Sequence, residues 1–125
     1  MNAAPLADTS LHFPPQLELA PDGSWFVGAR GLVRLDRRRV LMRIVKALAD
    51  HAATSPGSPL PTAELIARTW PGERFLPSSG TNRLYFAICA LRDLGLRPYL
   101  RHVPGGYLLD RSGRPQVPEL TLAAG

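Results

Sequence analysis

The stretch from Gly80 to Leu96 carries the side chains best suited to hold a polyanion. Asn82, Arg83 and Arg92 can each donate hydrogen bonds to base edges or to phosphate oxygens. Hydrogen bonds of this kind are reversible and involve no covalent chemistry. The first hypothesis for this stretch is therefore reversible binding to nucleic acid.

The same stretch has the spacing of one helix with a buried face. Leu84, Ile88 and Leu91 fall at i, i+4 and i+7, which is the apolar stripe of a packed helix. Further apolar side chains lie outside this stripe, and an exposed apolar patch rimmed by arginine is typical of a protein interface. The sequence therefore keeps a second reading open, in which this helix binds a protein partner through Tyr85, Phe86 and Cys89.

Charge favours a negatively charged partner. The 125 residues include 15 Lys and Arg against 10 Asp and Glu, for a formal net charge of +5. Lys46 is the single lysine, so the positive charge comes almost entirely from arginine. Such a balance indicates nucleic acid or an acidic protein surface.

Several classes of function find no support in the sequence. Cys89 is the single cysteine, and the three histidines lack a metal-ligand spacing, so we expect neither a disulfide nor a metal site. No phosphate-binding glycine loop or paired nucleophile and base is present, and we expect neither an enzyme nor a cofactor. No apolar run approaches the ~20 residues that span a bilayer. We expect a cytoplasmic protein associated with the nucleoid, with no membrane contact.

The pattern of apolar residues and turns predicts one α+β domain over residues 16–110. Residues 1–15 are expected to form a flexible lead-in, and residues 111–125 a flexible tail. From Gln16 to Leu35, short alternating runs separated by turns predict an antiparallel meander of three strands. Strands at 100–103 and 107–109, joined by Pro104-Gly105-Gly106, predict a closing hairpin.

Three helices are expected between the meander and the hairpin. Asp36 is the predicted N-cap of the first, which runs to about residue 53, and Thr62 caps a short second helix. The third helix spans about 80–94, with Ser79 or Thr81 as its N-cap and Gly95 as its stop signal.

This order resembles the winged helix-turn-helix effector domain of the OmpR/PhoB response-regulator family. The resemblance covers about residues 17–110 and rests on motif order: Leu17-Glu18-Leu19, then "VLMRIVKAL", then "PLPTAELIARTWPG" ending near Trp70. Ile88, Leu91 and Arg92 match the Ile-x-x-Leu-Arg signature that the third helix carries in this family. Gly106-Tyr107 matches the family's Gly-Tyr pair, which closes the wing. The length leaves no room for a receiver domain, so we expect a stand-alone effector domain.

The resemblance implies a transcriptional regulator that binds double-stranded DNA. The third helix would enter the major groove through Asn82, Arg83 and Arg92. Arg101 and His102 on the wing, about residues 99–109, would hold the adjacent backbone. Arg74 lies in the loop that often touches RNA polymerase in this family, so a polymerase or another regulatory protein is a candidate partner.

Further arginines at the first helix could add non-specific attraction to DNA, and a palindromic operator would require a homodimer. The alternative is that these charged residues have no binding role and are simply exposed to solvent at the start of the helix. The basic residues are Arg37, Arg38, Arg39 and Arg43.

Overall fold

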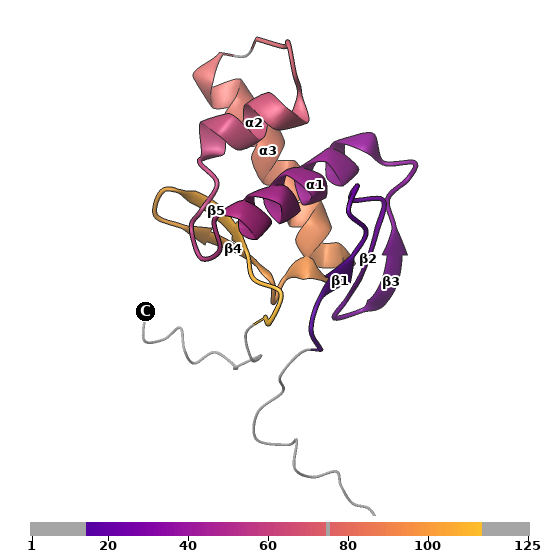
Figure 1. Cartoon of the computed structure of the whole chain (residues 1–125). Helices are drawn as coiled ribbons and strands as arrows, with labels where there is room; N and C mark the ends of the chain where they lie inside the picture. Colours follow the sequence, from indigo (N-terminus) through magenta and orange to yellow (C-terminus); the bar gives the residue numbers. More distant parts are fainter. Residues whose placement is uncertain (1–14, 75, 114–125) are drawn as a thin grey trace, which may run out of the picture.

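The computed structural model describes residues 15–74 and 76–113, which form one α+β unit (Figure 1). The predicted lead-in and tail lie almost wholly outside the described residues. Along the described chain the order is three strands, three α-helices, a short turn and two strands. The strands are β1 (Glu18–Leu19), β2 (Trp25–Gly28), β3 (Gly31–Arg34), β4 (Leu100–Val103) and β5 (Gly106–Leu109). The helices are α1 (Arg39–Thr54), α2 (Thr62–Thr69) and α3 (Pro77–Leu91), followed by the π-helical turn η2 (Arg92–Leu96).

The predicted N-terminal meander is confirmed. The sheet has the order β1-β2-β3, and both pairs are antiparallel. Gly28 pairs with Gly31, so the connection between β2 and β3 is a two-residue turn. Phe26 points into the core and is fully buried, whereas the outer face of the sheet leaves Leu32 61% exposed.

The first helix begins later than predicted, and Asp36 is not its N-cap. The amide of Arg38 donates to the carbonyl of Leu35, which closes a turn directly after β3. Only after this turn does the chain enter α1 at Arg39, with Arg38 in the cap position and no side chain capping it. The helix then buries one apolar face, with Leu41, Ile44, Val45 and Leu48 in the core.

The predicted caps of the second and third helices are also wrong. Thr62 is the first helical residue of α2, because the amide of Leu65 already bonds to the carbonyl of Pro61. The third helix starts at Pro77, since proline has a fixed φ and needs no hydrogen-bond acceptor at this position. Ser79 and Thr81 therefore lie inside α3 rather than at its cap.

The end of α3 is fixed by the N-terminal sheet. The α-helix ends at Leu91, and the turn η2 carries the chain to Gly95, whose φ is 123°. The amide of Ala29 donates to the carbonyl of Gly95 at 3.1 Å, and the guanidinium of Arg30 donates to the carbonyl of Asp93 at 2.8 Å. The β2–β3 turn thus binds the terminal carbonyls at this end of the helix.

The C-terminal hairpin pairs β4 with β5 in antiparallel register. Gly106 belongs to β5, so the turn is Pro104-Gly105 rather than the predicted three residues. Leu60, from the α1–α2 connection, forms a bridge to Tyr107 on the other side of β5. The hairpin is therefore held to the helices through its backbone as well as its side chains.

One hydrophobic core joins the helices to both sheets. Leu84, Ile88 and Leu91 of α3 are fully buried, as the spacing predicted. In Figure 1, α1 crosses in front of α3, the N-terminal sheet lies at one end of α1 and the hairpin at the other. Three helices with two small antiparallel sheets confirm the α+β class, and the arrangement is compatible with a small winged-helix-like fold.

Candidate nucleic-acid interface

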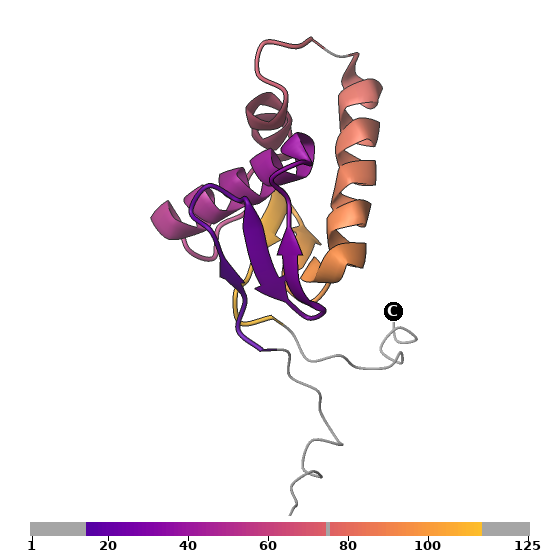
Figure 2. The same ribbon diagram turned by 90° about the vertical axis from the view of Figure 1, so that its right-hand side faces the viewer.

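The outer face of α3 is uncovered. Figure 2 shows α3 along one edge of the molecule, with no other described helix or strand on its outer side. Tyr85 is 53% exposed and Phe86 is 69% exposed, although both are aromatic. Asn82, one turn before Phe86, is also exposed, and Cys89 is half-buried. Asn82 of the DNA-binding reading and Tyr85, Phe86 and Cys89 of the protein-binding reading therefore share one accessible face.

Arg83 is turned toward the α2–α3 connection. Its guanidinium lies 3.5 Å from the carboxylate of Glu73 and its Cζ is 5.5 Å from the centre of the Trp70 ring. Both side chains of the ion pair are about half exposed, so the pair contributes little to stability, about 0–1 kcal/mol. The contacts nevertheless orient Arg83 away from Asn82, so these two residues do not form one donor group.

Tyr85 and Cys89 interact on the side of α3 that faces the hairpin. A hydrogen bond from the Tyr85 hydroxyl to the Cys89 sulfur raises the pKa of Tyr85, because the bond favours the protonated phenol. Burial is the main cause that raises the pKa of Tyr107 in β5, and Cys89 and Tyr85 raise it further. These two side chains of α3 are therefore within electrostatic reach of the hairpin.

An open basic groove of about 430 Å³ lies between the turn η2 that follows α3 and strand β4. Within the described residues, its lining includes three guanidinium groups and one imidazole. The cationic or titratable residues are Arg92, Arg97, Arg101 and His102, and Leu100 and Val103 complete the lining. A groove of this composition can hold phosphate oxygens through several charge-assisted hydrogen bonds.

Backbone and ring contacts fix the groove's side chains. Arg92 donates from Nε and Nη2 to the carbonyl of Leu100, at 3.3 and 3.2 Å, and so joins α3 to β4. The ring of His102 stacks on that of Tyr107, with centroids 4.5 Å apart and planes 16° apart. Burial raises the pKa of Tyr107, the stacking partner, above its ordinary value.

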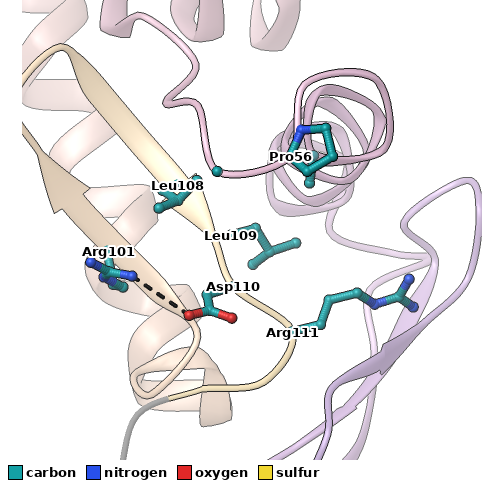
Figure 3. Close-up of a pocket in the computed structure, with 8 residues that line it drawn as sticks. Pro56, Arg101, Leu108, Leu109, Asp110 and Arg111 are labelled. Carbon is teal, nitrogen blue, oxygen red and sulfur yellow. Dashed lines mark ion pairs between the residues drawn. The ribbon is translucent and has the colours of Figure 1, made fainter.

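Arg101 is anchored on the hairpin by an acidic neighbour. Its Nη1 lies 3.5 Å from Oδ2 of Asp110, and both side chains are about one-third exposed. Figure 3 shows this pair beside a second cavity, of about 510 Å³, formed by Leu108, Leu109 and Arg111 with Pro56 of the α1–α2 connection. Arg101 therefore lines both hollows, and the ion pair limits how far its guanidinium can move.

The basic run of α1 is not brought to this groove. Arg37, Arg38 and Arg39 are exposed at the N-terminal end of α1, whereas the C-terminal end of α1 lies against β5. A helix of 16 residues is about 24 Å long, so most of that length separates the run from the hairpin. Arg43 instead donates to the carbonyl of Thr69 at 3.2 Å and ties α1 to the end of α2.

Arg74, the residue named for a polymerase contact, is exposed in the α2–α3 connection. Beside this connection, an open cavity of about 470 Å³ lies between α2 and the N-terminal part of α3. Ile66 and the exposed Leu76 give the cavity apolar walls, and Thr81 gives it a hydroxyl. Arg74 itself is not among its lining residues.

Sequence reasoning missed Arg97 as a member of the groove, because it lies beyond the predicted end of the third helix. The available signal was three arginines, Arg92, Arg97 and Arg101, on both sides of one helix-to-strand junction. It also missed the role of Arg30, which donates a hydrogen bond to the carbonyl of Asp93 just after α3. The two residues are 63 positions apart in the sequence. No local pattern encodes such a contact.

Within residues 15–74 and 76–113, no three His, Cys, Asp or Glu side chains gather closely enough to hold a metal ion. Among the helices of these residues, none combines the length and apolar character that a bilayer crossing requires. Comparison with models of known protein families gives no match, and neither does comparison with curated proteins.

Proposed function

We propose that this chain is a winged helix-turn-helix domain, similar to the OmpR/PhoB effector domains, and that it binds double-stranded DNA to regulate transcription. In this proposal α3 is the recognition helix and the β4–β5 hairpin is the wing. The order of elements and the bridge between Leu60 and Tyr107 support the fold assignment. The net charge of +5 supports a polyanionic partner.

The observation that carries the proposal is an uncovered face of α3 with a basic groove at the C-terminal end of the same helix. Asn82 and Phe86 are exposed on α3, and Arg92, which directly follows α3, lines the groove together with Arg97 and Arg101. A helix that enters the major groove needs phosphate contacts at its flanks to fix its register. The groove supplies such contacts beside the helix, from a different element of the fold.

Binding to a fluorescently labelled random duplex, followed by anisotropy at about 50 and 200 mM salt, tests this proposal. We expect binding that weakens steeply with salt, because cationic side chains displace counterions from the duplex. Phe86→Asp places a negative charge on α3 and should abolish binding. The matched control is Leu32→Asp, which changes a comparably exposed apolar residue on β3 and should have a much smaller effect. Absence of binding at low salt, or equal losses in both variants, would contradict the proposal.

The exposed aromatic face favours one alternative, a protein-interaction module. Tyr85 and Phe86 contact each other edge to face, with ring centroids 5.8 Å apart, and exposed aromatic residues are frequent anchors of protein interfaces. In this alternative α3 binds a protein partner through Tyr85, Phe86 and Cys89, with Arg74 as a further contact. A partner identified by capture would then bind the purified wild-type domain and Leu32→Asp, but not Phe86→Asp. A partner that binds all three equally would refute this alternative.

A further inference from the structure

The outward line of α3 is defined by the residues opposite its buried face. Because Leu84, Ile88 and Leu91 point into the core, the positions half a turn away point furthest outward. Asn82 and Phe86 occupy these positions, one turn apart on the same line, and Ser78 and Ser79 precede them in the first turn. These are the side chains that would reach deepest into a groove.

This line carries no guanidinium group. Arg83 is rotated about a quarter turn from Asn82 and is engaged by Glu73 and Trp70. Arg92 lies beyond the α-helical part of α3 and donates to the carbonyl of Leu100. Arginine is the commonest donor to the O6 and N7 acceptors of guanine, so α3 lacks the usual guanine reader on its outward line.

The groups that the line does carry match an A·T base pair. The amide of asparagine pairs in a bidentate way with N6 and N7 of adenine, and an apolar ring contacts the C5-methyl group of thymine. The Cβ atoms of residues one turn apart are about 6 Å apart, and base pairs are stacked about 3.4 Å apart. Asn82 and Phe86 can therefore contact the same base pair or neighbouring ones.

We infer that α3 selects A·T base pairs in the major groove, with Asn82 pairing with adenine and Phe86 packing on the thymine methyl. This inference rests on the proposed function and specifies which DNA the domain would prefer. It also gives the exposed Phe86 a binding role that needs no protein partner. The cationic groove between α3 and β4 then supplies affinity that is independent of sequence.

The experiment uses the full chain and a duplex library with a randomised central block, selected at moderate salt. We expect the selected duplexes to carry A·T pairs in that block. In a selected duplex, uracil in place of thymine removes only the methyl group, and wild-type affinity should fall about fourfold. Replacement of adenine by 7-deazaadenine removes the N7 acceptor and should lower wild-type affinity about tenfold.

Two variants assign each loss to its side chain. Phe86→Ala should be insensitive to uracil, and Asn82→Ala should be insensitive to 7-deazaadenine, while each remains sensitive to the other base. Both side chains are exposed, so neither variant should disturb folding, which circular dichroism checks. Uracil leaves the minor groove unchanged, so a response to it reports the major groove.

The outcomes separate this inference from the proposed function. Binding to all duplexes with equal affinity, or selection of G·C pairs, overturns the inference and leaves DNA binding intact. Losses that are the same in the wild type and both variants also overturn it. Absence of binding to any duplex at low salt overturns the inference together with the proposed function.

Discussion

Leu60 and Tyr107 exchange both of their backbone hydrogen bonds, at 2.8 and 3.0 Å. Leu60 belongs to the α1–α2 connection and Tyr107 to strand β5, so this exchange pairs the connection with the edge of the hairpin at one position. Because α2 begins at Thr62, two residues after Leu60, the position of the helix pair is coupled to that of the hairpin. The proposed recognition helix and wing thus belong to one rigid frame.

Gly106 is predicted to be indispensable to this frame. Its φ is 150°, and a Cβ at this position would overlap the carbonyl oxygen of Leu60. Gly106→Ala should therefore lower the free energy of unfolding by about 3 kcal/mol, through backbone strain and loss of the bridge. Urea denaturation measures this change.

The matched control for this substitution is Gly105→Ala. Gly105 has a φ of 99°, but a Cβ there would meet only the ring of Pro59 at an ordinary 3.4 Å. This variant has the backbone strain but no overlap with the Leu60 carbonyl, so it should lower the free energy of unfolding by about 1–2 kcal/mol. Equal costs for the two variants would contradict the role assigned to the Leu60 contact.

Stability is predicted to fall at alkaline pH because of two buried tyrosines. Burial raises the pKa of Tyr99 and of Tyr107 above the ordinary value of 10.0. Above pH 10 the unfolded chain therefore releases these protons before the folded one does, and the unfolded state is favoured. The stabilisation is complete below pH 10 and is lost as the pH rises toward the folded pKa values. Urea midpoints measured from pH 8 upward should be flat and then decline, and Tyr107→Phe should decline less steeply.

Arg97 and Arg101 are predicted to contribute sequence-independent affinity for DNA. Each is expected to neutralise a phosphate, so Arg97→Ala and Arg101→Ala should weaken binding to all duplexes alike. Each should also reduce the slope of log affinity against log salt by about one. Salt titrations monitored by anisotropy provide both quantities. Changes that depend on duplex sequence would assign these arginines to base readout instead.

The basic run of α1 is predicted to matter less than the groove. Arg37, Arg38 and Arg39 lie at the end of α1 remote from the hairpin, and charges beyond about 8 Å are largely screened at physiological salt. Arg37→Ala should therefore change affinity less than Arg101→Ala, although it removes the same charge. A larger loss for Arg37→Ala would mean that the DNA lies across α1.

The sequence predicted most of the fold because the apolar periodicity is strong. The buried line of Leu84, Ile88 and Leu91 and the tight turn between Gly28 and Gly31 were correctly assigned, since these features depend on neighbouring residues. The helix starts were wrong, because Asp36 lies in a turn closed by the carbonyl of Leu35, a contact that competes with capping. Polar residues near a helix start do not by themselves fix which one is the cap.

The candidate site was only partly predictable for a related reason. The exposed α3 face follows from helix periodicity, and the sequence therefore identified Asn82, Tyr85 and Phe86. The rotation of Arg83 toward Trp70 and Glu73 depends on how the α2–α3 connection folds back. The inclusion of Arg97 depends on the turn η2, which redirects the chain between α3 and β4. These are tertiary relationships that no local spacing specifies.

A direct test of the central claim is the map of backbone amide shifts in the domain when duplex DNA is added. At 13.6 kDa the chain suits nuclear magnetic resonance. We expect the largest shifts at residues 78–89 on α3 and 97–103 around the basic groove, with the N-terminal sheet unaffected. Shifts confined to the sheet or to Arg37–Arg39, or no shifts at low salt, would contradict α3 and the hairpin as the DNA-binding surface.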